Sequence, residues 1–380
     1  MTLSPPGTLL SAGDDAFVEP LPGLSSPPPR LAVKDMIAVK GCVQGAGLPV
    51  RAGRIADEDA ALVARFRAAG YAIAGTTHSD AAGFGTMTPW VTNPRHEGRA
   101  VGGSSGGAAA SVAAGRAEIG LGTDTGGSVR IPAAYCDLYA LKVSNGRAPT
   151  EGILPLSPTF DAPGILAATA KTLSAAAPVL LDDWRDGATP LPLHYDASAL
   201  RAAEPEIAAR FAVIASALEA AADEGTPPPY DEIAFAHSTL VCVEGLAVHL
   251  ADWTRAPEGF PPTIADALHY AQTLGAAEID AARATVATTR RSLRAHAKGR
   301  VLMRPTLPMP PAGRTVETVA LAGVSQPITN ANIRLTLSAN VAGLPVAVVP
   351  FPGLSVQFVG GFGEDEAVLA TALAAAARLA

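Results

Sequence analysis

Residues 102–132 read GGSSGGAAASVAAGRAEIGLGTDTGGSVRIP, with one glycine-serine turn near each end of the segment. Between the turns, the small residues at 108–115 favour a helix, and the apolar residues at 117–122 are typical of a buried strand. Either turn alone is a weak signal, because flexible loops and anion-binding turns before helices have similar compositions. The phosphate-loop pattern GxxxxGK[ST] is absent, since no lysine follows the glycines. Two such turns around a helix and a strand are far more specific than one.

The flanking sequence predicts an α/β sheet. Residues 31–33 are apolar, residues 57–70 have the period of an amphipathic helix, and residues 71–75 are apolar again, so strand, helix and strand alternate. We expect Asp57 to cap the helix and Gly70 to follow its last turn. The same patterns predict further strands at 117–122, 138–143, 301–307, 344–349 and 354–359, and helices at 199–223, 264–296 and 365–379.

The composition argues against several classes of protein. Hydrophobic residues make up 48% of the chain but are dispersed, which predicts a soluble protein with a large core and no membrane span. The chain begins without a basic and apolar leader, so no secretory signal is expected. The net charge of −7 argues against a nucleic-acid partner. The three cysteines and seven histidines show no disulfide or metal-ligand spacing, so the sequence predicts no metal, no cofactor and a cytoplasmic location.

Lys34 ends the first apolar run and is followed by an aspartate. A lysine in this position is usually a surface charge. If it is buried beside hydroxyl groups, however, desolvation penalises the ammonium form. The neutral amine can then act as a base toward a serine. Lys34 is therefore a candidate base.

The sequence resembles the amidase signature family in three features taken together: Lys34, the turn at residues 102–107 and the turn at residues 122–132. The resemblance runs from about residue 15 to the C-terminus and is weakest over residues 180–300. It implies an α/β fold, with a large mixed β-sheet covered by α-helices on both faces. It also implies a single domain over residues 1–380, with its core at 31–170 and 301–380 and with divergent helices at about 180–300 that shape the substrate region.

The resemblance implies a catalytic triad that needs neither cofactor nor metal. In it, Ser128 is the nucleophile, Ser104 is a bridging serine that follows a cis peptide bond, and Lys34 is the base. Ser128 Oγ would attack an amide carbonyl while its proton passes through Ser104 to Lys34, and the proton would return to the leaving amine. The developing oxyanion would be surrounded by the backbone N–H groups of Thr125, Gly126, Gly127 and Ser128.

Residues around the triad have supporting roles in this interpretation. Ser105 is expected either to hydrogen-bond within the first motif or to cap the helix that follows it. Asp124 and Arg130 are predicted to form a buried pair that holds the second turn, and Thr123 is interpreted as a turn residue. Cys136 has no histidine near it in the sequence, so buried packing is expected.

The substrate region carries less information. Gly83, Phe84 and Met87, followed by Trp90, are candidate pocket residues, with ordinary core packing as the alternative for the larger side chains. Arg130 is the only basic residue in the second motif and is already assigned to Asp124, so a carboxylate-bearing substrate lacks a partner there. A neutral, compact or aryl-substituted amide is favoured.

The leading hypothesis is an amidase that releases ammonia from a small carboxamide through a Ser128 acyl-enzyme, resembling compact members that act on indole-3-acetamide. The alternatives are a hydrolase of carbamoyl compounds (biuret, allophanate or urethane), a subunit similar to the glutamyl-tRNA amidotransferase A subunit, and a scaffold without catalysis. The expected partner is a small-molecule amide, with no nucleic acid or membrane involved. A monomer or homodimer is expected.

Overall fold

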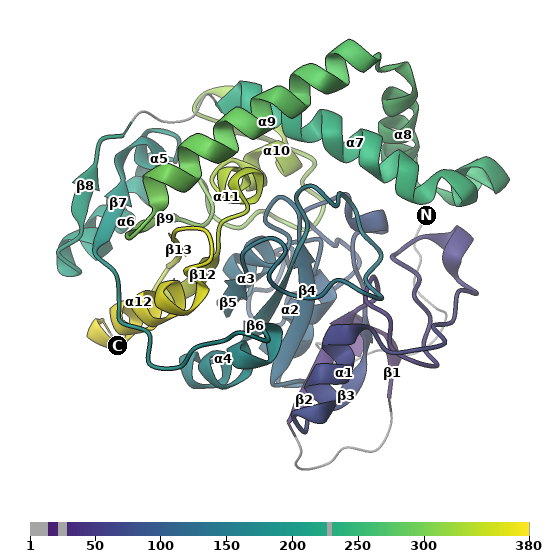
Figure 1. The fold of residues 1–380 in the computed structure, drawn as a ribbon, viewed down its shortest axis with the longest axis horizontal. Helices are drawn as coiled ribbons and strands as arrows, with labels where there is room; N and C mark the ends of the chain where they lie inside the picture. Colours follow the sequence, from purple (N-terminus) through teal and green to yellow (C-terminus); the bar gives the residue numbers. More distant parts are fainter. Residues whose placement is uncertain (1–13, 22–28, 226–229, 380) are drawn as a thin grey trace.

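The computed structural model describes residues 14–21, 29–225 and 230–379. Its centre is a sheet of eleven strands in the order β1-β3-β2-β4-β6-β5-β12-β13-β9-β7-β8 (Figure 1). β2 pairs in parallel with β3 and β4, the strands from β4 to β9 in this order pair antiparallel, and β7 pairs in parallel with β8 and β9. The predicted mixed sheet is confirmed. Its strands are β1 (Phe17–Pro20), β2 (Arg30–Lys34), β3 (Ala72–Thr77), β4 (Ile119–Asp124), β5 (Tyr139–Lys142), β6 (Ala162–Ala167), β7 (Leu193–Asp196), β8 (Ala221–Asp223), β9 (Val301–Pro305), β12 (Val346–Phe351) and β13 (Leu354–Val359).

The central strands are buried on both faces, because successive side chains along each strand enter two different core clusters. Leu141 and Ile165 point into a core cluster that also contains side chains of α1 (Ala61–Ala68), α4 (Ala170–Ala176), α6 (Pro205–Ala217) and α12 (Asp365–Arg378). Their chain neighbours Ala140 and Leu166 belong to the opposite cluster, with α2 (Gly106–Ala113) and α3 (Arg130–Tyr135). Helices therefore cover both faces of the sheet, as predicted.

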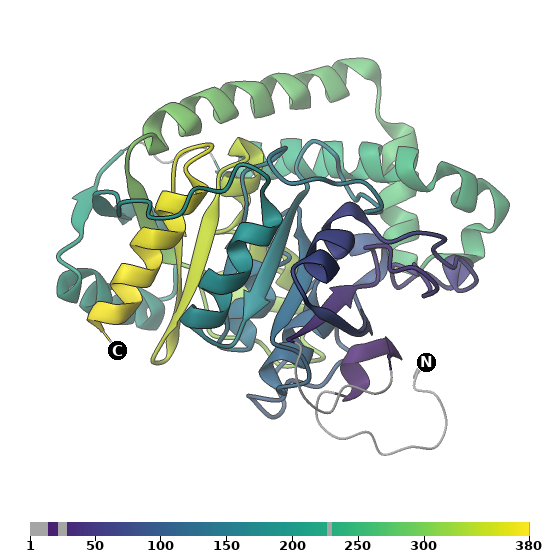
Figure 2. The same ribbon diagram turned by 60° about the horizontal axis from the view of Figure 1, so that its bottom comes forward.

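Three longer helices run along one side of this sandwich (Figures 1 and 2): α7 (Tyr230–Arg255), α8 (Pro262–Thr273) and α9 (Ala276–Ala297). By length and composition α7 could cross a membrane. In the structure its Ile233, Leu240 and Val241 pack in a core cluster with Val286 of α9. Here α7 is a packed helix of the fold, and it also supplies residues to the candidate site.

The remaining elements are short. Near the candidate site lie α10 (Ile328–Ile333) and α11 (Leu337–Ala342), and α5 (Ala197–Arg201) follows β7. The strands β10 (Thr318–Leu321) and β11 (Val324–Pro327) form a separate hairpin. The short 3₁₀ helices are Asp14–Ala16, Pro49–Arg51, Ala81–Gly83, Ala177–Leu180 and Pro257–Gly259.

Three sequence predictions about helices were wrong in detail. The first helix begins at Ala61, so Asp57 does not cap it. The predicted helix at 199–223 is two helices and a strand, because Pro205 begins a new helix at its first position. The predicted helix at 264–296 is interrupted at Leu274, whose backbone is extended. The single-domain organisation stays a prediction.

Candidate active site

The parallel pairing of β2 with β4 brings two chemically important segments together. Lys34 is the last residue of β2, and Thr123 and Asp124 end β4. Because parallel strands end at the same edge of a sheet, the lysine and the second glycine turn meet there. The first turn reaches the same place, since Ser105 N–H donates to Ser128 O at 3.1 Å. The three pieces that are distant in sequence therefore form one site.

Lys34 is fully buried, and its ammonium nitrogen contacts two hydroxyl groups. Nζ lies 2.8 Å from Ser104 Oγ and 2.8 Å from Thr123 Oγ1. Burial lowers the pKa of Lys34 to about 8, although nearby carboxylates, with Asp35 foremost, oppose the shift. About a tenth of the Lys34 population therefore carries the neutral amine at pH 7, against a far smaller fraction for an exposed lysine.

Ser104 occupies a tightly packed turn before α2. The Gly103-Ser104 peptide bond is cis, as the resemblance implies. A Cβ on Gly103 would lie 1.9 Å from Asp80 Oδ2, so only glycine fits beside this carboxylate. Asp80 accepts hydrogen bonds from Thr88 N–H and Thr88 Oγ1, while burial raises its pKa to about 6. Asp80 thus occupies the space that a side chain at residue 103 would need.

Ser105 and Ser128 complete the contact between the two turns. Ser105 Oγ donates to Thr123 O at 3.3 Å, and no side-chain bond from it caps α2. Neither of its two expected roles is seen, because the acceptor Thr123 O belongs to the second turn and the Ser105 hydroxyl therefore joins the two turns. Ser128 is largely buried, and it lines a cavity. No protein hydrogen bond to Ser128 Oγ is found among residues 14–21, 29–225 and 230–379, which leaves this oxygen available to a ligand.

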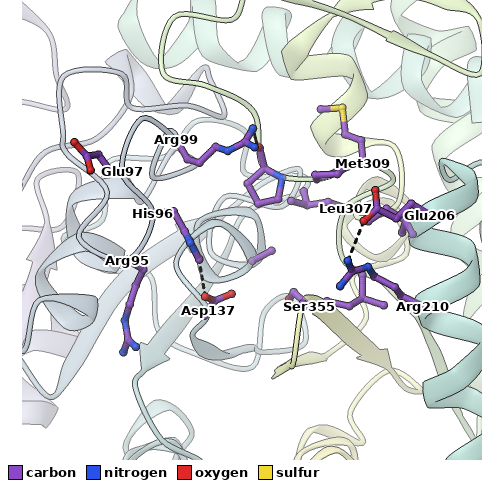
Figure 3. A pocket seen from close by; sticks show the side chains of 16 residues that line it. Arg95, His96, Glu97, Arg99, Asp137, Glu206, Arg210, Leu307, Met309 and Ser355 are labelled. Carbon is purple, nitrogen blue, oxygen red and sulfur yellow. Dashed lines mark hydrogen bonds and ion pairs between the residues drawn. The ribbon is translucent and has the colours of Figure 1, made fainter.

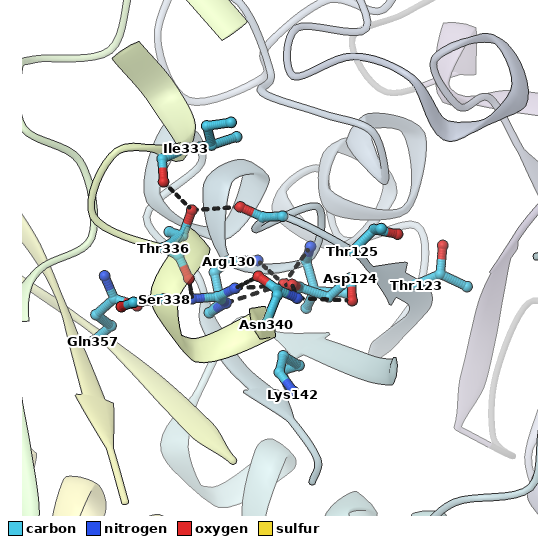
Figure 4. Close-up of polar contacts among 12 residues, drawn as sticks. Thr123, Asp124, Thr125, Arg130, Lys142, Ile333, Thr336, Ser338, Asn340 and Gln357 are labelled. Carbon is cyan, nitrogen blue, oxygen red and sulfur yellow. Dashed lines mark hydrogen bonds and ion pairs between the residues drawn. The ribbon is translucent and has the colours of Figure 1, made fainter. Parts of the chain in front are cut away.

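Asp124 and Arg130 form the buried pair that was predicted to hold the second turn (Figure 4). Both side chains are 0% exposed, and Arg130 donates to Asp124 from Nε at 3.1 Å and from Nη2 at 2.9 Å. Asp124 Oδ2 also accepts the Val129 N–H at 3.1 Å. Burial by itself would raise the pKa of Asp124, but the Arg130 guanidinium lowers it well below its usual range. Asn340 Nδ2 also donates to Asp124 Oδ1, and Arg130 Nη1 donates to Gln357 Oε1.

The cavity beside Ser128 has a volume of about 220 Å³. No residue of aspartate, glutamate, lysine or arginine lines it in the described part of the chain. It is walled by Gly83, Phe84, Gly85, Thr86, Thr125, Gly126, Ser128, Leu156, His237, Ser238, Val241, Cys242, Thr263, Ile264, Thr329, Asn330 and Ile333. Gly83 and Phe84 are therefore at the cavity, as the sequence suggested.

Met87 does not line this cavity, and the structure favours core packing, which was the alternative for this side chain. Its side chain belongs to the core cluster with Tyr135, whose hydroxyl lies 3.7 Å from Met87 Sδ. Trp90 also does not line the cavity. The Met87 thioether instead fills space in the core.

A larger cavity of about 570 Å³ lies among other residues (Figure 3). None of Lys34, Ser104 and Ser128 lines it. Its arginines (Arg95, Arg99 and Arg210) are matched by as many carboxylates (Glu97, Asp137 and Glu206), and Arg210 pairs with Glu206 at 3.0 Å. The candidate site is therefore the smaller cavity at Ser128.

Sequence reasoning missed three contributors. Thr123 is a partner of Lys34 as well as the residue before the turn. His237 Nε2 lies 3.1 Å from Thr125 O, and Thr336 Oγ1 donates to Gly126 O at 2.5 Å. The strand period could have placed Thr123 on the same edge as Lys34, but no local pattern marks His237 or Thr336. Among the described residues no cluster suited to a metal ion is found.

Comparison with known proteins identifies the class to which this architecture belongs. A family description of amidases matches residues 26–233. The indoleacetamide hydrolase of Pseudomonas syringae pv. syringae is 44% identical over 145 residues, which are 37% of this chain and only 32% of that protein. The 1-carboxybiuret hydrolase subunit AtzE of Pseudomonas sp. (strain ADP) is 30% identical over 366 residues, covering 88% of this chain and 79% of that protein.

A solved structure described as a crystal structure of an amidase is also similar, with a TM-score of 0.86 and 30% identity over 93% of this chain and 85% of that one. The mixed sheet with two glycine-serine turns at one edge is therefore an amidase-signature fold. The chain belongs to the amidase family.

Proposed function

We propose that the chain hydrolyses a small, neutral carboxamide to the carboxylic acid and ammonia. The observation that carries this proposal is the buried Lys34 amine within 2.8 Å of Ser104 Oγ, at the edge where Ser128 lines a cavity. Ser128 Oγ attacks the carbonyl carbon, and its proton passes through Ser104 to the neutral Lys34. The same route returns a proton to the amide nitrogen as the C–N bond breaks, which leaves a Ser128 ester. Water then hydrolyses this ester by the reverse proton path.

Thr123 explains how a neutral lysine remains oriented. A neutral amine has two N–H bonds and one lone pair. If one N–H donates to Thr123 Oγ1, the lone pair can accept the Ser104 proton across the same 2.8 Å contact. Thr123 is therefore proposed to aim the base.

The second turn is proposed to stabilise the oxyanion. In the described part of the chain, no hydrogen bond from the N–H of Gly126, Gly127 or Ser128 to a protein acceptor is found. These donors and Thr125 N–H lie in the turn that carries the nucleophile and are free to meet developing negative charge. The pair of Asp124 and Arg130 keeps this turn in place.

The walls of the cavity support an uncharged, partly apolar substrate. Phe84, Leu156 and Val241 contribute apolar surface, and Ser238 and Asn330 contribute polar groups. A charged acyl group would lose its hydration without gaining an ion pair there. We infer an arylacetamide or a similarly compact amide, in line with the name of the indoleacetamide hydrolases.

A second candidate is the hydrolysis of a carbamoyl compound of the biuret, allophanate or urethane type. It is favoured by the likeness to the 1-carboxybiuret hydrolase subunit, which extends over 88% of this chain. An ammonia-release assay on phenylacetamide, indole-3-acetamide, biuret, a urethane and succinamate discriminates the two. We expect turnover of the aryl amides to be the fastest and succinamate to be poor. Preferential turnover of biuret or the urethane would favour the second candidate, and turnover of none would contradict both.

The setting of the enzyme is also a proposal. The cysteines Cys42, Cys136 and Cys242 are free thiols in the structure, which fits a reducing cytoplasm. The proposed partner is the small-molecule amide substrate, and no nucleic acid is involved. The enzyme is proposed to be a monomer or a homodimer.

The pH dependence of hydrolysis should follow Lys34. Its pKa is lowered to about 8, and only the neutral amine accepts the proton, so kcat/KM should rise with pH and level off above about 8. Below that value it should fall by up to about tenfold per pH unit. Asp80 and Asp161, whose pKa values are raised by burial to about 6, add any further change only at lower pH. Initial rates between pH 5.5 and 10 measure this profile.

Lys142 provides the control for this prediction. It is also fully buried, burial lowers its pKa to about 7, and its Nζ donates to Val143 O. Lys34→Met should lower kcat/KM by about 10²- to 10⁴-fold. Lys142→Met should keep both the rate and the inflection. A wild-type profile that is flat between pH 6 and 9 would contradict the role of Lys34.

A further inference from the structure

Two backbone carbonyls of the second glycine turn are bound by side chains from distant parts of the chain. His237 of α7 lies 3.1 Å from Thr125 O through Nε2, and Thr336, which precedes α11, donates from Oγ1 to Gly126 O at 2.5 Å (Figure 4 shows Thr336). A carbonyl oxygen can only accept, so Nε2 of His237 carries a proton. Burial lowers the pKa of His237 to about 4, and the ring is therefore neutral near neutral pH.

The orientation of these carbonyls fixes the N–H groups next to them. A peptide unit is planar, and in the trans form its C=O and N–H point in opposite directions. The one cis bond found in the described residues joins Gly103 and Ser104, so the peptide units after Thr125 and Gly126 are trans. Binding Thr125 O thus aims the Gly126 N–H away from His237. Binding Gly126 O aims the Gly127 N–H away from Thr336.

The packing of Gly127 shows how closely Thr336 approaches the turn. Gly127 has a φ of +133°, a value that other residues rarely adopt. A Cβ at this position would lie 2.5 Å from Thr336 Oγ1 and 2.8 Å from Ile131 Cδ1. By contrast, a Cβ on Gly126 would make ordinary contacts of 3.6 Å with His237 and Ile333. The glycine at 127 therefore makes room for the hydroxyl that binds Gly126 O.

His237 is itself held in position. Its ring packs against Phe160 with a centroid distance of 4.5 Å, and its side chain lines the cavity that also contains Ser128. Thr336 Oγ1 also lies 3.2 Å from Ile333 O. Both groups are buried, so rotation of either peptide unit would break a hydrogen bond between buried polar atoms.

We propose that His237 and Thr336 are positioning residues that preorganise the oxyanion site of this enzyme. Each fixes the orientation of one peptide unit of the glycine turn. The Gly126 and Gly127 N–H groups are therefore oriented toward the substrate oxygen before negative charge develops on it. This inference rests on the proposed function. It adds α7 and the segment before α11 to the groups on which the rate of bond cleavage depends.

The test compares Thr336→Val with Thr336→Ser in steady-state hydrolysis of the best amide from the substrate panel. Valine keeps the shape but removes the donor, whereas serine keeps the hydroxyl. We expect Thr336→Val to lower kcat about 10- to 100-fold with KM within about twofold, because the carbonyl becomes free to rotate. Thr336→Ser should recover kcat to within about threefold of wild type. Thr273→Val is the control, since the Thr273 hydroxyl also donates to a backbone carbonyl, that of Tyr270, but on an exposed helix end.

A transition-state analogue provides a second measurement. The aldehyde that corresponds to the best amide forms a tetrahedral adduct with a serine nucleophile, so its affinity reports the oxyanion donors. Its inhibition constant should rise with Thr336→Val by the same factor as kcat falls. His237→Ala should weaken the aldehyde about tenfold or more, and His237→Gln, which can still donate, should weaken it less.

The outcomes of these experiments distinguish failure of the positioning role from failure of the proposed function. Thr336→Val with wild-type kcat and aldehyde affinity, or equal losses in the valine and serine variants, would overturn the positioning role. If Thr336→Val does not fold in urea-unfolding controls, the His237→Ala and His237→Gln pair decides instead. If Ser128→Ala remains as active as wild type, the proposed function itself fails. If only Ser128→Ala is inactive, the function stands and the positioning role is wrong.

Discussion

Replacing Ser128 with alanine should reduce amide hydrolysis by about 10⁵- to 10⁶-fold while leaving the fold unchanged. Loss of the nucleophile removes the covalent route, and what remains is the contribution of binding and of the backbone donors. The side chain loses a single oxygen for which no protein hydrogen-bond partner is found in the described part of the chain, so no buried group is left unsatisfied. Ammonia release and single-turnover acylation measure the effect, and urea unfolding measures the fold.

Ser174→Ala serves as the matched control. Ser174 is an exposed serine in α4, far in sequence from either turn, and its loss should change neither rate nor stability. Ser104→Ala is informative for a different reason, because it interrupts the proton path but retains the nucleophile. A slow acylation that still labels Ser128 would place Ser104 in proton transfer. Wild-type rates in Ser128→Ala would mean that another residue carries the reaction.

Local sequence signals marked the two turns and Lys34, and the resemblance to the amidase signature family implied the role of each residue. Residues 102–107 and 122–132 combine glycine, serine and helix signals, and the short run before Lys34 reads as a strand. Parallel pairing of β2 with β4 then brings them together without further information. The expected Asp124 and Arg130 pair follows from the same local turn, since the two residues are only six positions apart.

The missed residues depend on long-range packing. His237 binds a carbonyl 112 positions away, and Thr336 binds one 210 positions away. Neither residue stands in a pattern that distinguishes it from an ordinary helix residue. Met87 shows a different limit, because an apolar residue close to a glycine turn fits a pocket wall and a core equally well, and in the structure it lies in a core cluster. The helix boundaries failed where a proline or an extended residue interrupts a periodic segment.

Replacing Arg130 with methionine should destabilise the protein by about 3–5 kcal/mol, the usual cost of leaving a buried charge without its partner. Arg130 is completely buried and donates twice to Asp124, and it also donates to Thr336 O, Gln357 Oε1 and Asn340 Oδ1. Methionine fills much of the volume but supplies none of these donors. The free energy of unfolding in urea at pH 7 measures the loss.

Arg210→Met is the control for charge removal alone. Arg210 pairs with Glu206, but the two side chains are 51% and 61% exposed, so the loss should stay below about 1 kcal/mol. A similar small loss in Arg130→Met would contradict the structural importance of the buried pair. A large loss in both variants would point to a general effect of net charge.

The pair also predicts how stability responds to acid. Because the folded-state pKa of Asp124 lies below its unfolded value, the ion pair contributes stability above that unfolded value and loses it as the pH falls through the acidic range. In Arg130→Met the guanidinium no longer opposes burial, so the pKa of Asp124 should rise. Lowering the pH from 7 to about 4 should then cost the variant less stability than it costs the wild type. The difference between their unfolding free energies should narrow with acid, and a difference that stays constant would show that Arg130 stabilises the fold only by its neutral hydrogen bonds and packing.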